Sequence, residues 1–149
     1  MHTVTVESLP DRRYAVNINN GRHFIVSDEP TEGGGDDLGP NAHELLLASL
    51  GACTAITLRM YAELKQIPLE DVSVHLTHER VVPQEPEFTS EEIAEAGFER
   101  RDLIRLDIAL KGDLTPAQRE RMLEIAGRCP VHRALDARPR IVMALDGAD

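Results

Sequence analysis

The feature that most constrains the fold is one long apolar segment, residues 45–64, in a chain of 149 residues. Apolar or small residues occupy almost every helical face of this segment, and Pro68 follows it. A helix that is apolar all round is buried inside a fold. Asn41 and Glu44 have the spacing of a capping box, which marks where the helix begins. The segment therefore predicts a buried central helix on which the rest of the chain packs.

Polar residues interrupt this segment before it reaches the ~20 clean residues that a membrane span needs, so we expect no membrane span. The first residues, MHTVTVESLPDRR, lack the basic and apolar regions of a secretory signal, and the expected location is the cytoplasm. In that reducing compartment the two cysteines are not expected to form a structural disulfide. A length of 149 residues predicts a single domain, residues 1–149.

The charge of the chain argues against one class of partner. The formal net charge is −10 and only 3% of residues are aromatic. Nucleic-acid phosphates would be repelled, and unpaired bases would lack stacking partners. We therefore expect no nucleic-acid partner.

Strand and helix signals surround the central segment. Asn19-Asn20-Gly21 supplies residues that tolerate positive φ in a hairpin turn, and this places Arg22 at the shoulder of a hairpin. The Gly- and Asp-rich residues 31–40 predict a mobile loop. Alternation predicts strands over residues 3–7, 14–18, 23–26, 72–82, 103–110 and 141–145, and helices are predicted over 90–97, 115–127 and 129–135. The order is that of an α+β fold, with the central helix laid on an antiparallel sheet.

The two cysteines are the best indication of chemistry, because one thiol of a pair can attack an oxidant and the other can close a disulfide. Cys129 precedes Pro130 at a predicted helix start, where unpaired backbone N–H groups favour a thiolate. Cys53 lies about three turns inside the apolar helix, so burial should raise its pKa unless a cation reaches it. Arg22 is a better candidate for that cation than Arg59, which lies about 120° away around the helix. The alternative is that each cysteine is a small buried hydrophobic residue.

Four stretches of the chain carry a resemblance to a known family. They are Asn20-Gly21-Arg22-His23, Ser27-Asp28-Glu29-Pro30, GGGDDLGPNAHELLLASLGACTAITLRMYAE over residues 33–63, and Arg128-Cys129-Pro130-Val131-His132. In order and spacing they resemble the osmotically inducible protein C and organic hydroperoxide resistance family (OsmC/Ohr). The helix block is the most specific of them and looks most like the OsmC-like branch.

The resemblance implies an OsmC-like fold and an intertwined homodimer with two active sites at the subunit interface. It implies that Cys53 is the thiol that attacks an organic hydroperoxide and that Arg22 holds it as a thiolate. Cys129 would resolve the sulfenic acid by forming a Cys53–Cys129 disulfide. A dithiol reductant, such as a lipoyl protein or a thioredoxin-like protein, would reopen that disulfide. No metal or organic cofactor is implied.

This chain departs from the family pattern at one position. The family's peroxidases carry a glutamate ten positions before the helix cysteine, where it pairs with the arginine. Ten positions before Cys53 is His43, and Glu44 lies nine before it. In a regular helix Glu44 points away from Cys53, so it can act only through Arg22 or serve as a capping residue. Both roles for Glu44 stay open.

Other functions have weaker support. Cys129-x-x-His132 has ligand-like spacing, but the chain gathers too few cysteines and histidines for a typical zinc site. No G-x-S-x-G elbow supports a serine hydrolase. The main alternative is an OsmC-like protein that binds a small molecule or fatty acyl chain and uses its thiols as redox sensors, with little peroxidase activity.

Overall fold

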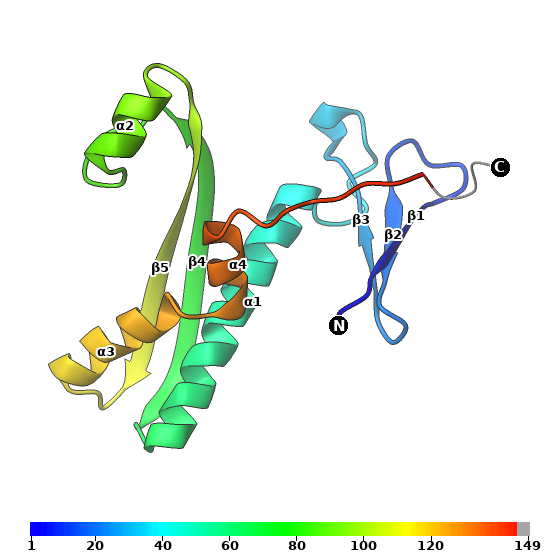
Figure 1. Ribbon diagram of the computed structural model, residues 1–149. Helices are drawn as coiled ribbons and strands as arrows, with labels where there is room; N and C mark the ends of the chain where they lie inside the picture. The colour runs from blue at the N-terminus through cyan, green and yellow to red at the C-terminus, as the bar shows by residue number, and fades with distance from the viewer. Residues whose placement is uncertain (146–149) are drawn as a thin grey trace. The chain divides into compact units, whose positions relative to one another are not determined.

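The computed structural model describes residues 1–145 (Figure 1). The chain divides into two compact units, Met1–Ala48 and a second that begins at Ser49. The elements, in chain order, are β1 (Thr5–Ser8), β2 (Val16–Asn19), β3 (Phe24–Ser27), η1 (Thr31–Gly33), α1 (Ala42–Lys65), β4 (Leu69–Val81), α2 (Ser90–Ala96), β5 (Arg101–Gly112), α3 (Pro116–Ala126) and α4 (Pro130–Asp136). The α+β class is confirmed.

The first unit is built on a small antiparallel sheet with the strand order β1-β2-β3. Ile18 on β2 pairs with Val6 on β1 and with Ile25 on β3. The hairpin between β2 and β3 turns where the sequence predicted it. Gly21 has a φ of 89°, and the backbone N–H groups of Arg22 and His23 donate to the side chain of Asn20.

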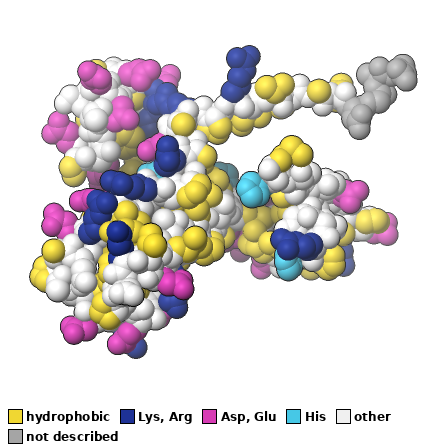
Figure 2. Space-filling model, turned by 60° about the horizontal axis from the view of Figure 1, so that its bottom comes forward, with side chains coloured by type: hydrophobic (Ala, Val, Ile, Leu, Met, Phe, Trp, Pro, Cys, Tyr) yellow, Lys and Arg dark blue, Asp and Glu magenta, His cyan; other side chains and the backbone are white. Residues whose placement is uncertain are grey.

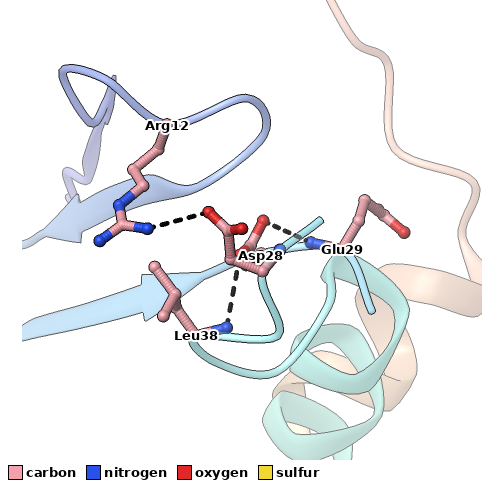
Figure 3. A network of polar contacts seen from close by, with 5 residues as sticks. Arg12, Asp28, Glu29 and Leu38 are labelled. Atoms are coloured by element: carbon pink, nitrogen blue, oxygen red, sulfur yellow. Dashed lines mark hydrogen bonds and ion pairs between the residues drawn. The ribbon is translucent and has the colours of Figure 1, made fainter. Parts of the chain in front are cut away.

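The loop after β3 is held together by one buried carboxylate. Asp28 is 4% exposed, and its two oxygens accept hydrogen bonds from the backbone N–H groups of Glu29, Asp36 and Leu38 (Figure 3). Arg12 adds an exposed ion pair with Asp36. The segment predicted to be a mobile loop therefore contains a short helical turn, η1, and a defined hydrogen-bond network.

Helix α1 starts as predicted. The backbone N–H of Glu44 donates to Oδ1 of Asn41, and the N–H of Asn41 donates to Oε2 of Glu44. By length and composition alone α1 is apolar enough to cross a membrane. Leu58 and Ala62 on one face of α1 belong to the buried core of the second unit.

The second unit is a helical layer on one face of a two-stranded antiparallel sheet. Strands β4 and β5 pair along their whole length, and Figure 1 shows α1 running beside them. Side chains from α1, α3 and the preceding loop form the buried core: Leu58, Ala62, Leu114, Met122, Ile125 and Ala126. Gly51 allows the helix to approach the sheet, because a Cβ there would stand 2.7 Å from Cδ1 of Leu76. The close approach fixes where α1 sits on β4.

Within a single chain, only the face of α1 that meets the sheet is buried. The buried residues are Leu50, Gly51, Thr54, Leu58 and Ala62, whereas Ile56, Met60 and Leu64 are 58%, 66% and 76% exposed. The helix is thus apolar on all sides, but only the stripe that meets the sheet is buried.

The predicted closing strand over residues 141–145 is wrong. These residues are described, and they form neither helix nor strand. Figure 2 shows hydrophobic side chains on the extended stretch that leads to the grey residues. Ile141, Val142, Met143 and Leu145 are each at least 80% exposed. Alternation of side chains indicates an extended backbone, but a strand also needs a partner edge, which this segment does not have among residues 1–145.

Candidate functional site

The candidate site is the thiol pair of the second unit. Cys53 lies on α1 and is partly exposed, whereas the side chain of Cys129 is completely buried. Both thiols are free. The two thiols are near enough for each to affect the pKa of the other. Their proximity brings together two cysteines from opposite ends of the second unit.

Cys129 is placed by the start of α4. Its backbone is extended, with φ −62° and ψ 141°, and Pro130 occupies the first position of the helix. The sulfur takes the role of the N-cap acceptor, because it accepts a hydrogen bond of 3.3 Å from the backbone N–H of His132. The Cys-Pro sequence therefore both starts the helix and directs the sulfur toward the helix N–H groups, as predicted.

Thr54 is a second, buried donor to the same sulfur. Its Oγ1 lies 3.7 Å from Sγ of Cys129, and neither side chain has any exposed surface. Thr54 lies on the buried stripe of α1 between Leu50 and Leu58, one turn from each. Sequence reasoning missed this residue. The available signal was a lone hydroxyl at helical spacing among the apolar residues of that stripe, directly after Cys53.

The surroundings of the two thiols shift their pKa values in opposite directions. Burial raises the pKa of Cys53, as expected, and the hydrogen bond and charge of Cys129 raise it further, against opposing donors at Val131 and Thr57. Burial alone would also raise the pKa of Cys129. The N–H of His132, the hydroxyl of Thr54 and the thiol of Cys53 outweigh burial and hold the pKa of Cys129 below its ordinary value. The two thiols therefore differ in acidity, with the pKa of Cys53 raised and that of Cys129 lowered.

The other two predicted site residues belong to the first unit. Arg22 lies in the turn between β2 and β3, and its side chain is exposed. Within the first unit its guanidinium pairs with no carboxylate. Glu44 has the capping role, since its Oε2 accepts from the N–H of Asn41. Roles for Arg22 and Glu44 in activating Cys53 stay predictions.

An apolar groove on the second unit begins at Thr57, one helical turn along α1 from Cys53. Its volume is about 640 Å³, and its walls come from α1, α3 and the loop before α4: Thr57, Met60, Tyr61, Glu63, Leu64, Ile125 and Arg128. Thr57 links the groove to the thiol pair, because it lies one turn after Cys53 on α1 and its hydroxyl lowers the pKa of that thiol. The groove is mostly carbon-lined, with one cation at Arg128 and one anion at Glu63.

The described residues contain no group of three or more His, Cys, Asp and Glu side chains that could hold a metal ion.

Comparison with known proteins places this geometry in context. A family model described as OsmC-like protein matches residues 33–144. No curated protein matches the chain. An OsmC-like protein from Mycoplasma pneumoniae has a similar structure, with a TM-score of 0.69, 19% identity, and coverage of 91% of this chain and 87% of the other.

Two further solved structures share the fold at low identity. An organic hydroperoxide resistance protein from Legionella pneumophila has a TM-score of 0.62 and 22% identity, over 91% of this chain and 90% of the other. The organic hydroperoxide resistance protein OhrB of Bacillus subtilis has a TM-score of 0.59 and 18% identity, over 89% of each chain.

Proposed function

The chain belongs to the OsmC-like protein family, and from this premise we propose that it reduces organic hydroperoxides with Cys53 and Cys129. The observation that carries the proposal is the proximity of two free thiols, one partly exposed and one buried. An accessible thiol can meet an oxidant, and a buried neighbour can close a disulfide before a second oxidant arrives.

The proposed reaction takes place in two steps at sulfur. The Cys53 thiolate attacks the distal oxygen of the hydroperoxide, the O–O bond breaks, and an alcohol leaves with a proton from solvent. The sulfenic acid of Cys53 is then attacked by Cys129, which forms a disulfide and releases water. A dithiol reductant, a lipoyl protein or a thioredoxin-like protein, returns both thiols. No metal or organic cofactor takes part in these steps.

Arg22 is proposed to supply the positive charge that Cys53 needs. Burial and the neighbouring Cys129 both raise the pKa of Cys53, and a guanidinium beside the sulfur would oppose both effects. Glu44 is proposed to orient Arg22. Capping occupies its Oε2, which leaves Oε1 available to accept from a guanidinium.

The apolar groove supports an organic substrate rather than hydrogen peroxide. A carbon-lined groove one helical turn from Cys53 offers burial to an alkyl or aryl group, and hydrogen peroxide has no such group to bury. The names of the proteins from Legionella pneumophila and Bacillus subtilis agree with this substrate class.

We further propose that the protein works as an intertwined homodimer, built from single domains, in the reducing cytoplasm. Apolar side chains that one chain leaves exposed on α1 and over residues 141–145 support a second copy as their cover. Ile56, Met60 and Leu64 lie along one such stripe of the helix.

The test is a single-turnover reaction of the reduced protein with cumene hydroperoxide. We expect one equivalent of peroxide to be lost and one disulfide to form. Cys53→Ser should abolish the loss, and Cys129→Ser should preserve one turnover but leave a sulfenic acid that dimedone traps. The Arg22→Lys and Arg22→Met variants should separate charge from geometry. Peroxide consumption that survives in Cys53→Ser would contradict the proposal.

The groove also favours a second candidate, an OsmC-like protein that binds a small amphipathic molecule or fatty acyl chain. Its walls are apolar and Arg128 could pair with an anionic head group. In that case native mass spectrometry of the purified protein would reveal a retained ligand, and the thiols would consume no peroxide. Both measurements can be made on one preparation of the protein, and together they distinguish the two candidate functions.

A further inference from the structure

We propose that Thr54 is a positioning residue of the thiol pair, whose buried hydroxyl holds the sulfur of Cys129 in place and stabilises negative charge on it for the attack on oxidised Cys53. This inference deepens the peroxidase proposal and rests on it. It gives Thr54 a task in the step that closes the disulfide.

The Cys129 sulfur accepts hydrogen bonds from two donors, the Thr54 hydroxyl at 3.7 Å and the backbone N–H of His132 at 3.3 Å. All exposed surface is lost from both side chains, so water cannot replace the hydroxyl as donor. Two donors directed at one buried sulfur stabilise negative charge on it.

The position of Thr54 on α1 argues against a packing role alone. Its neighbours along the stripe, Leu50 and Leu58, are buried apolar residues, and a valine would fill the same shape without a polar atom. Burying a hydroxyl has a cost unless it makes a hydrogen bond. The hydrogen bond that compensates for this cost goes to the sulfur of Cys129, an atom that reacts in the proposed chemistry.

The chemistry balances with these groups and solvent. The pKa of Cys129 is lowered by the same donors, which agrees with their effect on negative charge at the sulfur. As the Cys53 thiolate attacks the distal oxygen, the O–O bond breaks, and the alkoxide takes a proton from solvent. The Cys129 thiolate then attacks the Cys53 sulfenic acid, the departing hydroxide takes a proton from solvent to form water, and the disulfide is complete.

Thr54→Val tests the hydroxyl with little change of shape, and Thr54→Ser is the rescue. In a Cys53→Ser background, the ultraviolet absorbance of the thiolate reports the ionisation of Cys129 alone. We expect Thr54→Val to move its midpoint to higher pH and Thr54→Ser to leave it in place. Thr77→Val, on the exposed face of β4, is the matched control and should change nothing.

The rate of disulfide closure gives an independent readout. With both cysteines present, the closure driven by diamide should be about tenfold slower in Thr54→Val at neutral pH, and raising the pH should recover it. Equal midpoints and equal closure rates in the threonine and valine proteins would overturn the proposal. If Thr54→Val does not fold, Thr54→Ala gives the same comparison with a cavity in place of a methyl group.

These readouts need no hydroperoxide. A protein that shows the shifted midpoint but consumes no cumene hydroperoxide would remove the peroxidase proposal alone. The hydrogen-bonding role of Thr54 would stand. Peroxide consumption with an unmoved midpoint would remove the role of Thr54 and leave the peroxidase.

Discussion

At the scale of single residues, the unequal acidity of the two thiols is the property most open to measurement. The charge and hydrogen bond of Cys129 raise the pKa of Cys53. Replacing Cys129 with serine removes that charge, so the pKa of Cys53 falls and thiolate appears at lower pH. We predict that the pH for half-maximal alkylation of Cys53 by iodoacetamide decreases in Cys129→Ser. An unchanged or higher midpoint would show that Cys129 is not the thiolate of the pair.

Asp28 makes a second prediction at this scale. Its buried carboxylate accepts from three backbone N–H groups of the loop that follows β3 (Figure 3). Asp28→Ala leaves these donors unpaired, and we expect a loss of about 2 kcal/mol in the free energy of unfolding. Urea unfolding measures it. Glu29→Ala, at the adjacent exposed position, is the control and should stay within about 0.5 kcal/mol of the parent protein.

Individual residues also show how much of the candidate site could be predicted from the sequence. The chemical tendencies of Cys53 and Cys129 followed from helix position, because burial inside α1 and an N-cap at α4 are local properties. The prediction that they act as a pair came only from the resemblance, since nothing in the local sequence places α4 against α1. Thr54 was missed because its partner lies 75 positions away.

At the scale of elements, α1 is held by the stripe that meets the sheet. Leu58 is completely buried among side chains of α3 and the two strands. Leu58→Ala removes that contact and leaves a cavity, so we expect the free energy of unfolding to fall by about 2–5 kcal/mol. Leu123→Ala is the matched control, because Leu123 is 67% exposed on α3. Similar losses in the two variants would contradict the one-sided packing of α1.

Helix starts were the part of the fold that sequence predicted best. Thr115-Pro116 forms the predicted helix start, with a complete capping box to Gln118. Such signals are local and depend on a few neighbouring residues. The closing strand over residues 141–145 failed because a strand is defined by a distant partner. The division of the strands between two sheets depends on the same long-range pairing, and alternation carries no information about it.

At the scale of the whole molecule, the exposed apolar surface predicts self-association. Met60 is 66% exposed on the helical stripe of α1 that the single chain leaves uncovered. Met60→Lys would bury a charge in the proposed dimer interface, which is costly without a partner. We expect light scattering after size exclusion to show a dimer for the parent protein and a monomer for this variant. Thr77→Lys, on the exposed face of β4, should remain a dimer.

The burial of Cys129 has a consequence for how the protein would be recharged after a turnover. An external reductant can touch a sulfur only from solvent, and in this site only Cys53 has exposed surface. In the proposed cycle an incoming thiol would therefore bond to Cys53 and expel Cys129, whose lowered pKa makes it the better leaving group. The return path would thus be regioselective, with the mixed disulfide on α1.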